Sequence, residues 1–305
     1  MRLVLFPFGL LVFFIGMYLM RQGLSSIWEQ SIKHFLYRVT ATPLRGLLLG
    51  AGATAVMQSS SAVTVITMGM IDGKLLPWAS GLGIILGTNI GTCTTAQFLS
   101  IHLESYWWLI SLSGLLISLK YSWKSYGFPL IGLGIVLGSM SIMTWSVQYL
   151  QHLWRLNQSI SILEGVLWGL VITAIIQSSS AFMVMIIALG VNGVIGLEQA
   201  FPLILGSNLG TCVTAGLASI GGSPGSRKIF YSHLLLNLLG IFAFLPLLPA
   251  LYPLLTTLTS DPGKQIAAGH TLYNVICSVA ALPFTRLFAS FLSKLPPIDR
   301  QSSFN

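Results

Sequence analysis

The residues best suited to chemistry belong to a short polar motif that occurs twice in a very apolar sequence. Gln-Ser-Ser-Ser-Ala stands at 58–62 and again at 177–181. In both copies an Asn lies 31 residues after the Gln, within Gly-Thr-Asn-Ile-Gly-Thr-Cys (87–93) and Gly-Ser-Asn-Leu-Gly-Thr-Cys (206–212). A shift of 119 residues superposes both motifs, and 20 of the 51 positions from 46 to 96 are then identical. The chain therefore contains an internal duplication whose polar groups are costly to bury unless they bind something.

Each serine run precedes a fresh apolar stretch, so it is expected to cap a helix. Ser is a favoured N-cap, and the first turn of a helix has unpaired N–H groups and a positive dipole end, which together attract an anion. Hydroxyls donate to an oxyanion or accept toward a cation, and the Gln amide offers both functions. We therefore expect two anion-binding tips, made of Gln58, Ser59, Ser60, Ser61, Gln177, Ser178, Ser179 and Ser180.

The second motif in each copy is flanked by glycines, which would let a helix unwind and present backbone carbonyls. Carbonyl, amide and hydroxyl oxygens are ligands for hard cations, so these predicted breaks suit sodium. Neither motif contains Lys or Arg, so a doubly charged anion would need co-bound cations as its simplest compensation. The sodium-binding or supporting residues are expected to be Thr88, Asn89, Thr92, Ser207, Asn208 and Thr211.

Plainer interpretations of the serines compete with ion binding. Ser and Thr in membrane helices often serve only as hydrogen bonds between helices, but two register-matched copies, each with its Asn motif, favour binding. A nucleophilic serine lacks support, because the acidic residues stand at loop positions. We therefore predict that the chain is not an enzyme.

Two His–Asn pairs, His233 with Asn237 and His270 with Asn274, are spaced i and i+4, so each pair shares a helix face. A histidine inside the membrane can relay protons. A neutral histidine that is hydrogen-bonded to backbone or to Asn and braces the serine tips is the favoured interpretation. Both roles stay open.

Composition sets the class of protein. The chain is 54% apolar and only 7% charged, with a mean hydropathy of +0.83, whereas an ordinary soluble domain has roughly 25% charged residues. The net charge of +8 is spread through loops between apolar stretches, which indicates membrane topology and no nucleic-acid binding. The three cysteines make no disulfide framework, and nucleotide and zinc motifs are absent, so we expect no cofactor and no metal except sodium.

Apolar stretches near 3–20, 105–119, 127–146, 229–250 and 267–291 are long enough for membrane helices, and 75–98 and 199–219 also qualify. The first is expected to be retained, because no signal-peptide cleavage site follows it. Segments 24–42 and 148–163 mix aromatic with basic residues, which suits helices near the membrane interface.

The segments at 46–71 and 165–191 decide the topology. Each has only about half the residues of a crossing on either side of its polar centre, so each is predicted to be a re-entrant hairpin. If both segments are hairpins, 12 of the Lys and Arg residues lie on one face of the membrane and 3 on the other, whereas the division is 10 to 5 if both segments cross. Basic residues gather on the cytoplasmic face of membrane proteins, so the more uneven division favours the hairpins. Each unit then crosses an odd number of times, which predicts two inverted-topology repeats.

The expected architecture is thus an all-α polytopic membrane protein. Its first repeat is 1–122, its second is 123–250, and an additional helix with a short tail is 251–305. Each repeat should contain one re-entrant helical hairpin and one membrane helix broken at the Asn motif.

The paired motifs, the stretch 227–237 and the sequence Ala-Gly-His-Thr-Leu-Tyr-Asn at 268–274 resemble the type II sodium-dependent phosphate cotransporters in their compact bacterial form. The resemblance covers about 44–284. It implies sodium-coupled movement of inorganic phosphate across the plasma (inner) membrane, with both serine motifs forming the phosphate and sodium sites. Many members carry a soluble regulatory domain after the membrane part, and we expect no such regulation here.

Other functions remain open from the residues alone. A sodium-independent phosphate channel or exporter would ignore a sodium gradient, and a sodium-coupled transporter of another small oxyanion would show competition with phosphate. A membrane scaffold without transport would have to keep two polar tips at membrane depth. The expected partners are phosphate, sodium and the lipid bilayer, and the chain could act alone or as a homodimer.

Overall fold

The computed structural model describes residues 5–39, 42–101, 103–151, 160–220, 224–285, 287–288 and 290. Every regular element in these ranges is a helix. Five helical segments are long and apolar enough to cross a membrane, namely Leu5–Leu24, Lys124–Ser146, Leu197–Ser219, Pro224–Leu258 and Pro262–Phe284. The predicted class, an all-α multi-pass membrane protein, is confirmed.

The helices of the first half are α1 (Leu5–Val39), α2 (Pro43–Met57), α3 (Ser60–Asp72), α4 (Trp78–Leu99) and α5 (Trp107–Ser118). The second half has α6 (Lys124–Gln151), α7 (Ile162–Ile176), α8 (Ser179–Val191), α9 (Leu197–Ser219), α10 (Pro224–Phe244), α11 (Leu248–Leu258) and α12 (Pro262–Ala281). The bounds of α2 and α3 match those of α7 and α8 after a shift of 119 residues. The sequence duplication is therefore also a duplication of local structure.

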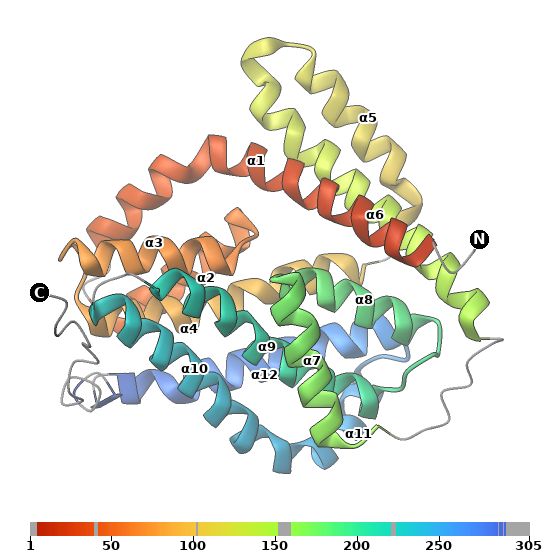
Figure 1. Cartoon of the computed structure of the whole chain (residues 1–305). Coiled ribbons are helices and arrows are strands. Elements are labelled where there is room, and N and C mark those ends of the chain that lie inside the picture. Colours follow the sequence, from red (N-terminus) through yellow and green to blue (C-terminus); the bar gives the residue numbers. More distant parts are fainter. Residues whose placement is uncertain are drawn as a thin grey trace, which may run out of the picture.

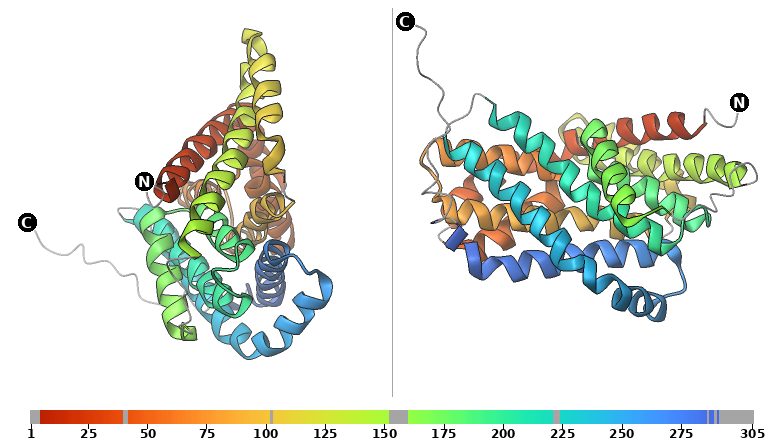
Figure 2. Two further views of the ribbon diagram at one scale, coloured as in Figure 1. Left: turned by 90° about the vertical axis from the view of Figure 1, so that its right-hand side faces the viewer. Right: turned by 60° about the horizontal axis from the view of Figure 1, so that its bottom comes forward.

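Helices α1, α5 and α6 form an outer layer beside the other helices (Figure 1). Figure 2 shows this layer from a second side, where α5 and the adjoining part of α6 project away from the rest. Close approach holds α1 on α6, because a Cβ added at Gly16 would lie 2.8 Å from the carbonyl oxygen of Gly132. Small residues of this kind let membrane helices pack backbone to backbone.

The remaining helices form the core that carries both serine motifs. Helix α2 packs on α4, and α7 packs on α9 in the same way. A Cβ added at Gly87 would lie 2.1 Å from the Leu47 carbonyl oxygen, and one added at Gly206 would lie 2.0 Å from that of Val166. The motif glycines are thus needed for contact between helices.

This packing corrects the prediction of broken membrane helices. Both α4 and α9 run without interruption through Gly-x-Asn-x-Gly-Thr. The glycines that were expected to unwind the backbone instead remove side chains where α2 and α7 cross. The carbonyls of the motif consequently remain within regular helices.

Some predicted segments also differ in extent. From Leu5 to Val39, the expected span 3–20 and the expected interfacial segment 24–42 belong to one continuous helix, α1. Helix α5 has 12 residues, or about 18 Å, which is short of a crossing. Helix α4 is not among the segments apolar enough to span, because hydroxyl residues and glycines dilute it. Residues 1–4, 152–159 and 291–305, which include parts of the predicted first span, interfacial segment and tail, lie outside the described residues.

Candidate functional site

The two serine motifs form the same local structure. Gln58 ends α2 and Gln177 ends α7, both with left-handed backbone, at φ 51° and 54°. For a residue other than glycine this conformation costs about 1–2 kcal/mol. The next residue caps the following helix: Ser59 Oγ accepts the Ala62 N–H at 3.2 Å, and Ser178 Oγ accepts the Ala181 N–H at 3.3 Å. The predicted N-caps of the fresh helices are therefore confirmed.

Both motifs line one cavity of about 70 Å³, although 119 residues separate them in the chain. Its walls come from α1, from the α2–α3 and α7–α8 junctions, and from α4 and α9. Its lining residues are Arg21, Thr54, Gln58, Ser59, Ser60, Ser61, Thr92, Thr95, Gln177, Ser178, Ser179, Ser180, Thr211 and Thr214. By the same measure a cavity that just holds one water has about 10–15 Å³, so the space suits a small inorganic ion.

Four serine hydroxyls are available to such an ion. Within the described part of the chain, none of them makes a side-chain hydrogen bond to a protein group. They are those of Ser60, Ser61, Ser179 and Ser180. All four stand in the first turns of α3 and α8, so both helices begin at the cavity wall. Each helix N-terminus contributes the equivalent of about half a positive charge. The wall is thus arranged to favour an anion.

Arg21 is the only charged side chain among the described residues that line this cavity. It belongs to α1, and its Nε donates to the carbonyl oxygen of Gln58 at 2.9 Å. Sequence reasoning missed it, because it searched for Lys and Arg only within the motifs. The signal that could have found it is its position inside the apolar segment Leu5–Leu24, where a charge is itself an indication of function.

The residues predicted from the second motifs divide into two groups. Thr92 and Thr211 line the cavity, together with three threonines that sequence reasoning missed, Thr54, Thr95 and Thr214. Thr88 and Ser207 do not line it. Both are fully buried, and their hydroxyls donate to the Ile85 and Ile204 carbonyl oxygens of their own helices, at 2.7 and 2.9 Å.

The two motif asparagines are joined by Asn237 of α10 and do not line the cavity. Asn89 Nδ2 donates to Asn237 Oδ1 at 3.0 Å, and Asn237 Nδ2 donates to the Asn208 carbonyl oxygen at 3.2 Å. This arrangement ties α4 and α9 to one residue. These bonds belong to Asn237 and not to His233, and they join α4 and α9 rather than the serine tips.

The two histidines lie away from the cavity. His233 is 4% and His270 is 0% exposed, and neither is among its lining residues. The hydrogen bonds expected for their rings do not form, because no protein group among the described residues partners a ring nitrogen of either one. Asn274 Nδ2 bonds the His270 backbone carbonyl oxygen at 3.1 Å rather than the ring.

The two tips differ in how their glutamines are held. Gln58 Oε1 accepts the Thr95 hydroxyl at 2.5 Å, and its Nε2 donates to the Ala55 carbonyl oxygen at 2.5 Å. Gln177 is exposed, and its side chain makes no hydrogen bond to a described protein group. Thr214, the counterpart of Thr95, has an unpartnered hydroxyl. The second tip therefore offers more oxygen and amide groups to a ligand.

A family model described as Na+/Pi-cotransporter matches residues 12–145 and 151–250, which include both serine motifs. The chain belongs to the Na+/Pi-cotransporter family. The resemblance seen in the sequence is thereby confirmed. This is a family of transporters, which agrees with the expectation that the chain is not an enzyme.

Relatives within the Na+/Pi-cotransporter family differ in length. YqeW of Bacillus subtilis, an uncharacterized protein, is 34% identical over 97% of this chain and 98% of its own. The "Putative inorganic phosphate export protein YjbB" of Escherichia coli strain K12 is 25% identical over 94% of this chain, which spans only 55% of YjbB. The mouse sodium-dependent phosphate transport protein 2A is 29% identical over 68% of this chain and 29% of its own. No solved structure matches the chain significantly.

Proposed function

We propose that this protein moves inorganic phosphate across the plasma membrane with sodium, and that phosphate binds in the cavity between the two Gln-Ser-Ser-Ser tips. The observation that carries the proposal is that both motifs and Arg21 line one small cavity. Inorganic phosphate is of suitable size and charge, and the family and the names of the YjbB and 2A relatives refer to phosphate.

Charge balance supports a phosphate ligand. Arg21 contributes one positive charge, and the N-termini of α3 and α8 add about half a charge each. The sum is roughly the charge that phosphate carries at neutral pH. The hydroxyls of Ser60, Ser61, Ser179 and Ser180 would donate to its oxygens.

Arg21 changes the argument for sodium. The sequence argument required co-bound cations because the motifs contain no basic residue, yet Arg21 already stands at the cavity. Sodium coupling is therefore proposed from the family and from the oxygen atoms of Thr92, Thr211 and Gln177, since hard cations prefer oxygen ligands. Four residues expected at sodium sites are proposed only as supports, namely Thr88, Asn89, Ser207 and Asn208.

The proposed membrane arrangement has two inverted repeats, 1–122 and 123–250, followed by 251–305. The pairs α2–α3 and α7–α8 would enter as re-entrant hairpins from opposite faces, which would present the cavity to each side in turn by alternating access. The matching bounds of the two pairs support this arrangement.

Labelled phosphate flux in proteoliposomes tests the function. Purified protein should take up phosphate faster with an inward sodium gradient than with choline in place of sodium, and excess sulfate should leave the uptake unchanged. Equal rates with and without the gradient would refute sodium coupling. Competition by sulfate would refute selectivity for phosphate.

The same assay tests the site. Ser60→Ala and Gln177→Ala should abolish the sodium-dependent flux, whereas Ser113→Ala, which changes an exposed serine of α5, should not. Thermal melting of each purified variant should show folded protein. If both cavity variants transport like the wild type, phosphate does not bind between the tips.

Outward movement of phosphate is a second candidate, favoured by the name of the YjbB relatives. Vesicles loaded with labelled phosphate distinguish it. An exporter should release phosphate when sodium is absent from both sides, whereas the sodium-coupled protein should release it only when sodium is present inside.

A further inference from the structure

The second serine tip contains a glutamine and a threonine that could bond each other but do not. Gln177 and Thr214 both line the serine cavity. Gln177 is exposed, and its carboxamide makes no hydrogen bond to a described protein group. The Thr214 hydroxyl is buried and has no partner among the described residues. An unpaired buried hydroxyl is unfavourable, so this tip keeps one hydrogen bond unmade.

The first tip shows the bond that the second tip lacks. Thr95 donates its hydroxyl to Gln58 Oε1 at 2.5 Å, and Gln58 Nε2 donates to the Ala55 carbonyl oxygen at 2.5 Å. The shift of 119 residues that superposes the motifs also places Thr95 on Thr214 and Ala55 on Ala174. The second tip therefore has every group that this arrangement requires. We call the glutamine–threonine bond the latch of a tip.

The backbone geometry of both tips allows the latch. Gly91 lies one turn before Thr95, and a Cβ added there would lie 2.5 Å from the Ala51 carbonyl oxygen of α2. Gly210 lies one turn before the second threonine, and its added Cβ would lie 2.7 Å from the Leu170 carbonyl oxygen of α7. Both glutamines also share the left-handed conformation, at φ 51° and 54°. The two helix crossings are thus nearly alike, so rotation of the second glutamine side chain is enough to close its latch.

Two differences explain why only the first latch is closed. Gln58 Nε2 also lies 3.4 Å from the Thr94 hydroxyl, whereas the counterpart of Thr94 is Val213, whose side chain has no polar group. Gln58 is half-buried and Gln177 is exposed, so water competes for the carboxamide of the second tip. A side chain in water gains little net free energy when it exchanges water for a protein group. Loss of that water would shift the balance toward the latch.

An ion in the serine cavity would remove such water. The cavity of about 70 Å³ has room for several waters, and a phosphate bound there would take their place beside Gln177. The carboxamide would then lose its solvent partners. By the geometry of the first tip, the Thr214 hydroxyl and the Ala174 carbonyl oxygen are the groups that would replace them. A hydrogen bond between protein groups is also stronger where water is excluded.

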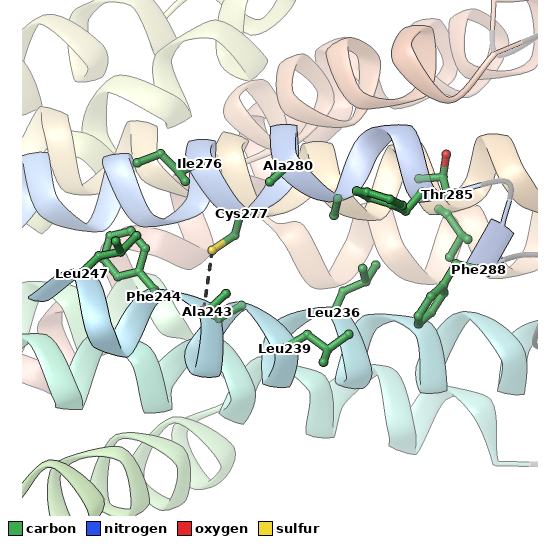
Figure 3. A pocket seen from close by; sticks show the side chains of 14 residues that line it. Leu236, Leu239, Ala243, Phe244, Leu247, Ile276, Cys277, Ala280, Thr285 and Phe288 are labelled. Carbon is green, nitrogen blue, oxygen red and sulfur yellow. Dashed lines mark hydrogen bonds between the residues drawn. The ribbon is translucent and has the colours of Figure 1, made fainter.

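The outer groove between α10 and α12 offers no comparable pair (Figure 3). It has about 370 Å³, and the polar side chains among its described lining residues are Cys277 and Thr285. Cys277 Sγ donates to the Gly240 carbonyl oxygen at 3.8 Å, the bond that is dashed in Figure 3. Thr285 donates its hydroxyl to the Leu282 carbonyl oxygen at 2.8 Å. Both polar groups of this groove are therefore already paired, in contrast to those of the second tip.

We infer that Thr214 is a positioning residue for Gln177, and that phosphate binding closes the second latch. The inference rests on the proposed function. The first tip is then a pre-formed half of the site, whereas the second tip adapts to the ion. Once latched, the Gln177 carboxamide keeps one N–H donor and one oxygen lone pair for the bound ions. Thr214 acts on phosphate only through Gln177.

Equilibrium binding of labelled phosphate to the purified protein, in detergent with sodium, tests the inference. Thr214→Val should weaken the phosphate affinity about fivefold, because a hydrogen bond of about 1 kcal/mol forms only in the bound state. Without phosphate its melting temperature should equal that of the wild type. Thr214→Ala should behave in the same way, and Thr214→Ser, which keeps the hydroxyl, should restore the affinity. Thr256→Val, which removes an exposed hydroxyl of α11 away from the cavity, should leave the affinity unchanged.

Hydrogen exchange of the tips, followed by mass spectrometry, separates positioning from direct contact with the ions. Without phosphate, residues 177–181 should exchange faster than residues 58–62, because only the first tip is latched. Saturating phosphate should slow the exchange of 177–181 in the wild type, but much less in Thr214→Val. A role of Thr214 in stability alone would not produce this dependence on phosphate.

Four results would count against the inference. If Thr214→Val and Thr214→Ala bind phosphate like the wild type, no second latch forms. If they bind more weakly but saturating phosphate still protects 177–181 fully, Thr214 contacts the ions itself. If they melt at a lower temperature without phosphate, the second latch is closed before binding. These three outcomes overturn the inference alone, whereas wild-type protein that binds no phosphate in sodium would refute the proposed function and the inference with it.

Discussion

Replacement of Arg21 by glutamine should raise the KM for phosphate about tenfold to a hundredfold. Arg21 is the only charged side chain among the described residues of the cavity wall. A hydrogen bond to a charged group contributes about 1.5–3 kcal/mol, and each 1.4 kcal/mol is a factor of ten in affinity. A bare Coulomb energy at 4 Å would be about 4 kcal/mol, but Arg21 is partly exposed, so the smaller figure applies.

Arg21→Lys separates the charge from the hydrogen-bond geometry. Lysine keeps the positive charge but lacks the Nε that bonds the Gln58 carbonyl oxygen, so its KM should lie between those of the wild type and Arg21→Gln. Initial rates of labelled phosphate uptake into proteoliposomes, measured over a range of phosphate concentrations at a fixed sodium gradient, provide the KM values. Lys264→Gln is the charge-matched control at an exposed site.

Two results would refute this reasoning. If the KM of Arg21→Gln stays within twofold of the wild type, the guanidinium does not act on the anion. If Arg21→Lys is as impaired as Arg21→Gln, the bond to Gln58 matters and the charge does not. Thermal melting of each variant in detergent shows whether either result reflects unfolded protein.

Three further predictions concern the free energy of unfolding, measured by thermal melting in detergent. Gly87→Ala should destabilise the protein by about 3 kcal/mol, because the added Cβ would overlap the backbone of α2. Gly52→Ala is the control, and it should stabilise the protein by about 0.5–1 kcal/mol, because nothing lies within 4 Å of the added Cβ. Equal effects of the two substitutions would contradict the close packing of α2 on α4. Asn237→Ala should cost about 1–3 kcal/mol, because it removes the two hydrogen bonds that join α10 to α4 and α9. An unchanged melting temperature would show that Asn237 does not hold these helices together. Thr95→Val should cost about 1 kcal/mol, because it removes the hydrogen bond to Gln58 Oε1. Thr214→Val should change the stability by less than about 0.5 kcal/mol, because the Thr214 hydroxyl has no partner. A larger effect of Thr214→Val than of Thr95→Val would contradict the difference between the tips.

Local features of the site could be predicted from the sequence. The ends of α2 and α7 and the starts of α3 and α8 coincide with Gln-Ser-Ser in both copies, because a serine N-cap acts within one turn of its own helix. The duplication then indicated that both copies would behave alike. Neither inference required knowledge of distant parts of the chain.

Features that depend on distant segments could not be predicted. Arg21 bonds the Gln58 carbonyl oxygen, which lies 37 residues away in the chain. Thr54 lines the cavity, and its place there depends on how α2 packs against α4. The continuity of α4 and α9 was mispredicted for a related reason. Glycine permits both an unwound backbone and a close helix crossing, and only the position of the neighbouring helix decides between them.

The two halves of the structure resemble each other in their helix contacts as well as in their sequence motifs. The paired cysteines of the Asn motifs contact different late helices: Cys212 Sγ accepts Asn237 Nδ2 of α10 at 3.2 Å, and Cys93 Sγ lies 3.8 Å from the His270 carbonyl oxygen of α12. Helix α12 therefore packs on α4 in the way that α10 packs on α9. This similarity is not visible in the sequence, because a shift of 119 residues does not superpose α12 on α10.

This pairing has a mechanical consequence for the cavity. Asn237 ties α4 to α9, so the walls contributed by these two helices are held in one body. Arg21 belongs to the outer layer of α1, α5 and α6, and it bonds the Gln58 carbonyl oxygen of the first tip. A displacement of the first tip away from α1 would break that bond. We therefore expect that such a movement would also withdraw the guanidinium from the cavity, so that one hydrogen bond would couple the position of this tip to the positive charge of the cavity.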